Sequence, residues 1–166
     1  SPWSYSARGL ALAMLERFDE AIADLDRAVE VDGNFLPARL NRGVANWLAG
    51  NREAAENDFT RLLDGLGGSP MAEAAYYRAV LRWEAGESSA AIADLEKVLS
   101  ARPEFPSAKL LQSRIYYLTG DLDRGTDCLN SWLASNAVRS ERSATNQAFD
   151  TAGWQSAFKR ARFLRR

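Results

Sequence analysis

Histidine is absent from this chain of 166 residues, and cysteine occurs once, as Cys128. The lack of histidine removes the Ser-His-Asp and Cys-His nucleophile arrangements and the commonest zinc ligand. A single cysteine allows no internal disulfide, which fits a reducing compartment. We therefore expect no catalytic residues, no metal site and no cofactor, and we expect that the protein is not an enzyme.

Long apolar runs are also missing. The sequence has no stretch of 18 apolar residues, so no membrane span is expected. Its first residues do not resemble a signal peptide. These features predict a cytoplasmic protein and leave the periplasm open. The chain opens with Ser1 rather than Met, which suggests a piece excised from a longer protein.

The composition is that of a folded chain, with 46% hydrophobic and 26% charged residues. Its length suits one domain or one short repeat array. The net charge of −1 hides an asymmetry between residues 1–138, which sum to −6, and residues 139–166, which sum to +5. An acidic body therefore ends in a basic tail.

An internal repeat is the strongest signal in the sequence. Residues 18–33 have apolar side chains at three- and four-residue spacing, which predicts one amphipathic helix. Residues 88–103 repeat that pattern, with AIADL at 21–25 and again at 91–95, while 52–67 and 122–137 are weaker copies. Four series share separations of 34, 36 and 34 residues: small Gly9, Gly43, Ala79 and Ser113; small Ala21, Ala55, Ala91 and Gly125; large Leu25, Phe59, Leu95 and Leu129; and turn residues Glu16, Gly50, Gly86 and Gly120.

The residue types explain the repeat as two helices joined by a tight turn. Only Gly, Ala or Ser fits where the helices of a pair cross closely, and the large residue fills the space beside the crossing. A glycine at the bend accepts the left-handed backbone that ends the first helix. The period and the order of small, turn, small and large residues resemble the tetratricopeptide repeat family over residues 2–139.

The resemblance implies an all-α fold, a right-handed superhelical solenoid of about four helix-turn-helix repeats with a C-terminal capping helix. We place the repeats near 2–35, 36–69, 72–105 and 106–139, in a repeat array over residues 1–139. Residues 140–166 are expected to form a polar loop and a basic C-terminal helix. Helices are predicted near 2–16, 19–31, 36–49, 52–64, 70–85, 88–100, 106–119 and 122–135.

Prolines and polar residues refine these boundaries. Pro2, Pro37, Pro70 and Pro106 fall in the first turn of a first helix, where a missing N–H costs little. Ser1 and Ser69 are expected N-caps. Residues 135–146 look like a loop because the period fails there. One face of residues 147–164 then carries Trp154, Ala157, Phe158, Ala161 and Leu164, which predicts a final helix covering the last repeat.

By resemblance, the first helix of each pair lines the concave side and holds the partner. The predicted binding groove is apolar and aromatic, which is typical of an interaction site. Trp47, Trp83 and Tyr117 occupy equivalent positions and are expected to form a ladder along it. The predicted groove residues are Trp3, Leu40, Asn41, Val44, Trp47, Tyr76, Tyr77, Val80, Trp83, Leu110, Arg114 and Tyr117. The alternatives are that these aromatics pack within or between repeats, or that another segment fills the groove.

The ligand is expected to be an extended or helical protein segment with apolar anchors. Some members of the family clamp a peptide's terminal carboxylates with basic residues and asparagines. Asn41 matches one such position, but Ser6, Leu10, Pro37 and Tyr77 stand where other polar groups would be. A carboxylate clamp is therefore disfavoured, and no small-molecule substrate is expected.

Other constellations favour structural roles. The acid pairs Asp24 with Asp26 and Asp121 with Asp123 lie on second helices or their caps, and solvated helix faces explain them better than catalysis. Cys128 is expected to be a buried, small apolar residue. The Gly-rich stretch 64–71 lacks a P-loop lysine and is interpreted as a turn.

Three functions remain open at this point. The first is a non-catalytic scaffold for protein-protein interaction. The second is the regulatory or targeting domain of a larger enzyme, such as a kinase or transferase. The third, less favoured, is nucleic-acid binding by the tail residues Lys159, Arg160, Arg162, Arg165 and Arg166, whose charge would equally solubilise a cap. A homo-oligomer is left open.

Overall fold

The computed structural model describes residues 1–65 and 70–142. These residues form eight α-helices and contain no strand. The helices are α1 (Pro2–Met14), α2 (Phe18–Val31), α3 (Leu36–Ala49), α4 (Arg52–Asp64), α5 (Pro70–Glu84), α6 (Ser88–Ala101), α7 (Pro106–Leu118) and α8 (Leu122–Arg142). The predicted all-α solenoid of four helix pairs is confirmed.

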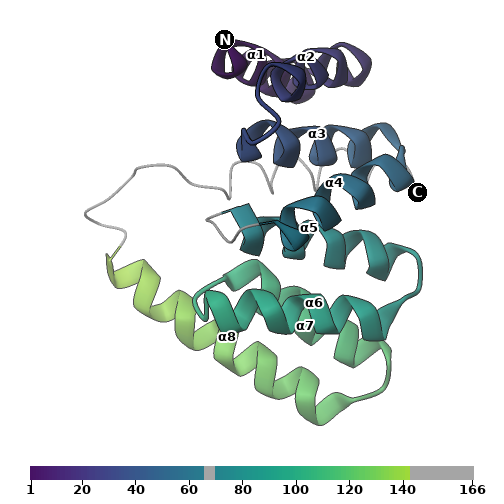
Figure 1. Ribbon diagram of the computed structural model, residues 1–166. Coiled ribbons are helices and arrows are strands. Elements are labelled where there is room, and N and C mark those ends of the chain that lie inside the picture. Colours follow the sequence, from purple (N-terminus) through teal and green to yellow (C-terminus); the bar gives the residue numbers. More distant parts are fainter. Residues whose placement is uncertain (66–69, 143–166) are drawn as a thin grey trace.

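The four pairs stack in chain order, with α1 and α2 at one end and α8 at the other (Figure 1). Each first helix contacts the first helix of the next pair, as α1 does α3, α3 does α5 and α5 does α7. No two second helices are in contact among the described residues. The first helices are therefore drawn together and form the inner layer of the stack, while the second helices are spread apart and form the outer layer.

The predicted crossing of small against large residues is confirmed in the first two pairs. A Cβ added at Gly9 would lie 2.7 Å from Leu25 Cγ, and one added at Gly43 would lie 2.6 Å from Phe59 Cε1. Leu25 and Phe59 are fully buried. The absence of a side chain at the two glycines is thus what lets each pair of helices close around its large residue.

The turn that joins each pair is left-handed in all four copies. Gly50, Gly86 and Gly120 have φ of 89°, 82° and 86°. The first copy has Glu16 there, with φ of 59°. The sequence period places this glutamate at a glycine position, and its backbone follows the other three turns even though a side chain makes that conformation unfavourable.

The helix starts agree with the positions of the prolines. Pro2, Pro70 and Pro106 begin α1, α5 and α7, and Pro37 is the second residue of α3. Ser1 caps α1 by accepting a hydrogen bond from the Ser4 backbone N–H at 3.4 Å. The second expected cap, Ser69, lies outside the described residues.

One boundary prediction was wrong. Residues 135–146 were expected to be a loop, but α8 continues to Arg142. The segment contains neither glycine nor proline, and serine and asparagine at a few positions do not end a helix. The loss of the repeat period marks the end of the helix-pair pattern and not the end of the helix. The predicted final helix at 147–164 lies outside the described residues.

Candidate functional site: the inner surface of the helix stack

The predicted groove residues all lie on α1, α3, α5 and α7, the four helices of the inner layer. Their exposure differs strongly along the stack. Val44 and Trp47 are buried, with 7% and 9% of their surface exposed. Leu110 and Tyr117, on α7, are 37% and 38% exposed. The inner surface is therefore packed in its middle and open near α7.

Aromatic rings fill the middle of this surface. The Trp47 and Tyr77 ring centroids lie 6.0 Å apart, and Tyr77 stacks on Phe59 at 5.8 Å. Tyr76 contacts Tyr77 at 5.6 Å and Phe105 at 5.3 Å. Burial raises the pKa of both Tyr76 and Tyr77 to about 12. These rings connect the second repeat to the third and reach the residue that precedes α7, so the alternative that the aromatics pack between repeats describes this part of the stack.

Trp47 is further tied to the next repeat through its indole nitrogen. Its Nε1–H donates to Glu84 Oε2 at 2.9 Å, near the end of α5. Leu40 and Val80 pack at the edge of the same cluster. Trp47 therefore bridges α3 and α5 as a core residue with one edge reaching the surface.

The α7 end of the inner surface carries one group of accessible side chains. Arg114, which is exposed, lies over the Trp83 ring with its guanidinium carbon 4.7 Å from the ring centroid. Tyr117 OH lies 2.9 Å from Thr126 Oγ1, which fixes the ring against α8. Trp83 is partly buried against the core of the third and fourth repeats. The predicted ladder is thus graded, from a buried Trp47 through a half-buried Trp83 to an exposed Tyr117.

At the other end, Trp3 is 69% exposed and meets Phe35 edge-on at 4.6 Å. Asn41, the residue at a carboxylate-clamp position, donates its side-chain amide to Ser6 Oγ at 3.4 Å. Tyr77, where another clamp residue would stand, is partly buried among aromatic rings. Both side chains therefore make contacts within the protein.

A series of arginine–aspartate pairs, which sequence reasoning missed, joins the two layers. In each of the first three repeats an arginine on the first helix makes a two-pronged ion pair with an aspartate 16 residues later on the second helix. The pairs are Arg8 with Asp24, Arg42 with Asp58 and Arg78 with Asp94. The arginines recur at the separations of the small residues that follow them, so the same period search could have found the pairs.

The second and third arginines also reach back to the preceding repeat. Arg42 Nη1 donates to Asp26 at 2.7 Å, and Arg78 Nη1 donates to Thr60 Oγ1 at 3.1 Å. Each guanidinium therefore holds three elements together: its own helix, the helix it pairs with and the outer helix of the repeat before.

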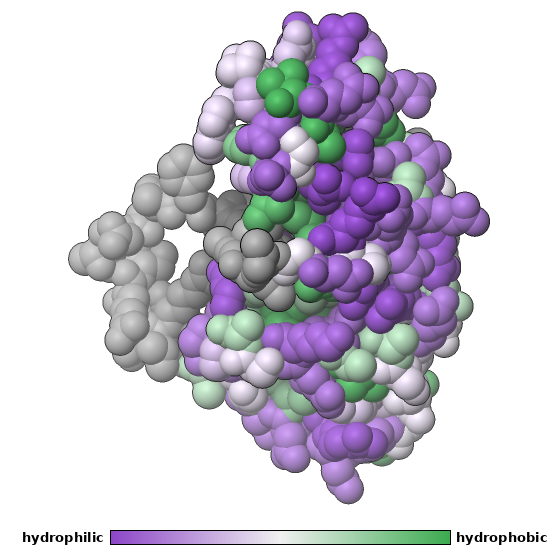
Figure 2. Space-filling model, in the orientation of Figure 1, coloured by the Kyte–Doolittle hydropathy of each residue, from purple (hydrophilic) through white to green (hydrophobic). Residues whose placement is uncertain are grey.

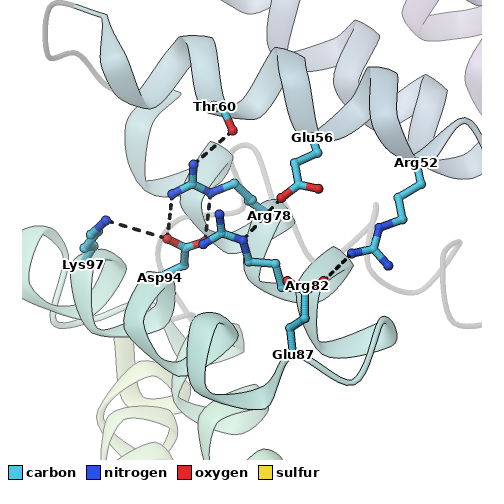
Figure 3. A network of polar contacts seen from close by, with 8 residues as sticks. All are labelled: Arg52, Glu56, Thr60, Arg78, Arg82, Glu87, Asp94 and Lys97. Atoms are coloured by element: carbon cyan, nitrogen blue, oxygen red, sulfur yellow. Dashed lines mark hydrogen bonds and ion pairs between the residues drawn. The ribbon is translucent and has the colours of Figure 1, made fainter.

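The third repeat has the densest cluster (Figure 3). Asp94, fully buried, accepts from Arg78 Nε and Nη2 at 2.9 and 2.8 Å and from Arg82 Nη1 at 2.9 Å. Arg82 reaches on to Glu56 of α4 at 3.5 Å. These bonds of the Asp94 carboxylate and of Arg82 link α4, α5 and α6.

The expectation that the acid pairs lie on solvated faces was wrong for Asp24. It is 6% exposed, and the Arg8 hydrogen bond is the first cause of the lowered pKa of its carboxyl group. Asp121 does act at a cap, since its Oδ1 accepts from the Arg124 backbone N–H at 3.1 Å. The Arg124 side chain lowers the pKa of Asp121 as well.

The fourth repeat replaces the ion pair by neutral residues. Gln112 and Cys128 occupy the arginine and aspartate positions, and Cys128 Sγ lies 3.4 Å from Gln112 Oε1. Cys128 is half-buried, and burial is the main reason that the pKa of its thiol is raised. A raised pKa disfavours the reactive thiolate, in agreement with a structural role.

Neither metal ligation nor a membrane span finds support in residues 1–65 and 70–142. No group of three or more acidic, cysteine or histidine side chains is placed there to hold a metal ion. In that same part of the chain, no helix is both long and apolar enough to cross a bilayer.

Comparison with known proteins gives one family. A family model described as Tetratricopeptide repeat matches residues 6–70 and 76–137. A 60-residue stretch is 37% identical to human DnaJ homolog subfamily C member 7 and covers 36% of this chain but only 12% of that protein. The same values hold for the mouse protein.

Solved structures show the same fold at low identity. The crystal structure of MamA matches with a TM-score of 0.76 and 21% identity, over 85% of this chain and 81% of that one. The thermophilic TPR protein TTC0263 of Thermus thermophilus matches with 0.68 and 18%, over 81% and 74%. YrrB, described as "a TPR protein with an unusual peptide-binding site", matches with 0.65 and 16%, over 80% and 68%. Repeat period, helix pairs and family match agree, and the chain belongs to the tetratricopeptide repeat family.

Proposed function

We propose that this protein is a non-catalytic scaffold that binds a peptide or protein segment on the open part of its inner surface. The observation that carries the proposal is the group formed by Trp83, Leu110, Arg114 and Tyr117, which we name the α7 site. It presents apolar side chains beside an exposed cation on the inner layer of a repeat stack. Exposed apolar groups gathered at one place are typical of an interaction surface.

The chemistry of the α7 site indicates the kind of segment. Leu110 and the Tyr117 ring offer apolar contact, and an anchoring side chain at such a place contributes about 2–4 kcal/mol to binding. Arg114 makes no ion pair with a described residue, and its stacking on Trp83 holds the guanidinium in place. A segment with an aromatic or aliphatic anchor next to a carboxylate would satisfy both features.

Much of the surface elsewhere is charged, for example on the outer helices. Figure 2 shows a visible face dominated by hydrophilic residues, with hydrophobic ones in small separate groups. The outer helices α2 and α4 carry many charged side chains, most of them acidic. Surfaces of that kind are well solvated and give an apolar anchor little to bind.

Trp47 is less suitable than the α7 site for testing the proposal. It is buried and bridges two repeats, so Trp47→Ala should cost about 3–5 kcal/mol of stability. A loss of binding in that variant would then reflect a loss of folding. Leu110 and Arg114 are exposed, and replacing them leaves the core intact.

The test is selection from a random peptide library displayed on phage, with the wild-type protein as bait. We expect enrichment of peptides that combine an apolar anchor with an acidic residue, and loss of their binding to Leu110→Ser and to Arg114→Glu. Leu15→Ser is the matched control, because Leu15 is 67% exposed at the far end of α1 and should bind as the wild type does. Equal binding to all three variants would contradict the α7 site.

A further inference from the structure

One face of α1 corresponds to the face of α3, α5 and α7 that packs against the preceding repeat. This face is buried in α3, α5 and α7. In the later repeats the positions equivalent to Ser4 and Ala11 are covered by the preceding repeat and are at most 1% exposed. Those residues are Ala38 and Ala45, Ala74 and Leu81, and Ala108 and Ile115. In α1, Ser4, Ala7 and Ala11 are exposed. The first repeat therefore presents an uncovered copy of the surface on which repeats join.

Arg8 lacks the hydrogen bond to a preceding repeat that the equivalent arginines make. Arg42 and Arg78 each use a third donor, Nη1, on the preceding repeat, where Asp26 and Thr60 accept it. Among the described residues, Arg8 donates its side-chain hydrogen bonds to Asp24 alone, and its side chain is 62% exposed, against 20% for Arg42 and 8% for Arg78. We call Ser4, Ala7, Arg8 and Ala11 the N-terminal face.

The opposite end of the stack carries the other half of the same interface. In the first three repeats, Val29, Leu63 and Leu99 pack against the repeat that follows. The equivalent residue on α8 is Leu133, which is 51% exposed. Asn130, also exposed, stands where Asp26 and Thr60 stand, and its side-chain oxygen is an acceptor. We call Asn130 and Leu133 the C-terminal face.

We propose that a second copy of this chain covers the N-terminal face with its own C-terminal face, so that copies associate end to end. The arrangement continues the interface already present between repeats. Leu133 of one copy lies over Ser4, Ala7 and Ala11 of the next, as Val29 packs beside Ala38. Arg8 Nη1 donates to the Asn130 side-chain oxygen, as Arg42 Nη1 donates to Asp26.

Such an interface is heterologous, because it joins two different faces. Contacts of this kind leave one free face at each end of every assembly and allow further copies to add. Repeat stacks are suited to this growth because each repeat contacts only its neighbours.

The test is sedimentation velocity of the full chain over a wide range of concentration. Ala11→Glu places a charge on the N-terminal face, and Leu133→Glu places one on the C-terminal face. Both positions are exposed, so both variants should fold, which thermal unfolding followed by circular dichroism verifies. Ala93→Glu is the matched control, since Ala93 is exposed in the middle of the stack.

We expect the wild type and Ala93→Glu to gain mass with concentration and each end variant to remain at the 18.4 kDa of one chain. An equal mixture of the two end variants should recover a dimer of twice that mass and nothing larger, because each retains one open face.

Three results would overturn the proposal. A wild type that stays monomeric throughout would mean that something other than a second copy covers one of the two faces, such as residues 147–164, whose apolar side chains are predicted to cover the last repeat. Self-association that survives either end variant would place the interface elsewhere. A mixture of the two variants that stays monomeric would show that the two faces do not bind each other.

Discussion

Replacing Asp94 by asparagine should destabilise the protein far more than the same change at Asp24. The two residues are equivalent in the repeat and each pairs with an arginine 16 residues earlier. Asp94 is fully buried and accepts three charged hydrogen bonds, and its partner Arg78 is also buried. Arg8, the partner of Asp24, is largely exposed. The difference in burial of the arginines, and not the number of ion pairs, should decide the cost.

The magnitude follows from the charges left behind. Asp94→Asn strands Arg78, which is 8% exposed, and removes one partner of Arg82, which is 23% exposed. Breaking a buried pair by removing one partner costs about 3–5 kcal/mol. For a chain of this size that lowers the melting temperature by about 6–20 °C. Asp24→Asn leaves Arg8 in water, where hydration replaces the lost bond, so a much smaller shift is expected.

The assay is thermal unfolding of both variants and the wild type, followed by circular dichroism at the helical band and repeated in urea. A double variant, Arg78→Gln with Asp94→Asn, should recover part of the loss because it removes the stranded charge. The reasoning would be refuted if Asp24→Asn lowered stability as much as Asp94→Asn does.

Three further perturbations test the packing, the turns and the buried rings. Gly43→Ala should cost about 1–3 kcal/mol, because the new Cβ would meet the Phe59 ring, and adding Phe59→Leu should recover most of that loss in thermal unfolding. Glu16→Gly should stabilise by about 1 kcal/mol in urea unfolding, because glycine accepts the positive φ without strain. Raising the pH from 10 to 12 should lower the free energy of unfolding, because burial raises the pKa of Tyr76 and Tyr77 to about 12 in the folded protein, whereas both ionise near 10 when unfolded; absorbance at the tyrosinate band follows the ionisation.

Each of these outcomes can fail independently. Gly43→Ala with wild-type stability would mean that the helices of the second pair are not in close contact. A Glu16→Gly variant that is less stable would show that the glutamate side chain contributes more than its backbone costs. The tyrosines contribute stability below pH 10 that is lost as the pH rises through 12, so a Tyr76→Phe variant with an unchanged alkaline midpoint would contradict the assigned burial.

The sequence predicted the helix pairs well because the features that define them are local and periodic. Glu16 was placed at a turn only because Gly50, Gly86 and Gly120 stand at the same phase, and its φ of 59° agrees. The end of α8 was mispredicted because the period describes packing against neighbouring helices, whereas the helix itself continues wherever nothing breaks it.

The candidate site was harder to predict because the repeat period does not determine how deeply a side chain is buried. Trp47, Trp83 and Tyr117 share one phase, yet their exposure is set by what stands on the next helix. Tyr77 and Glu84 lie against Trp47, whereas α8 contacts Tyr117 through Gly125 and Thr126 and still leaves it 38% exposed. An ion pair is likewise invisible to a search for small and apolar residues, although its charged partners keep the same spacing.

The hydrogen bonds from Arg42 and Arg78 to the preceding repeat make the two ends of the stack unequal in stability. Arg42 and Arg78 hold the repeat before them, while in the fourth repeat Gln112 and Cys128 make no such charged bond. Unfolding of the first or second repeat therefore removes the acceptor, Asp26 or Thr60, that the arginine of the next repeat uses. In the part of the chain that the structure describes, unfolding of the fourth repeat leaves no buried arginine without its acceptor. Unfolding should start at the α7–α8 end and spread toward α1, and amides of the fourth repeat should exchange their hydrogens first. The α7 site would then lie on the part of the protein that opens most readily, where an arriving segment can be ordered together with the repeat that binds it.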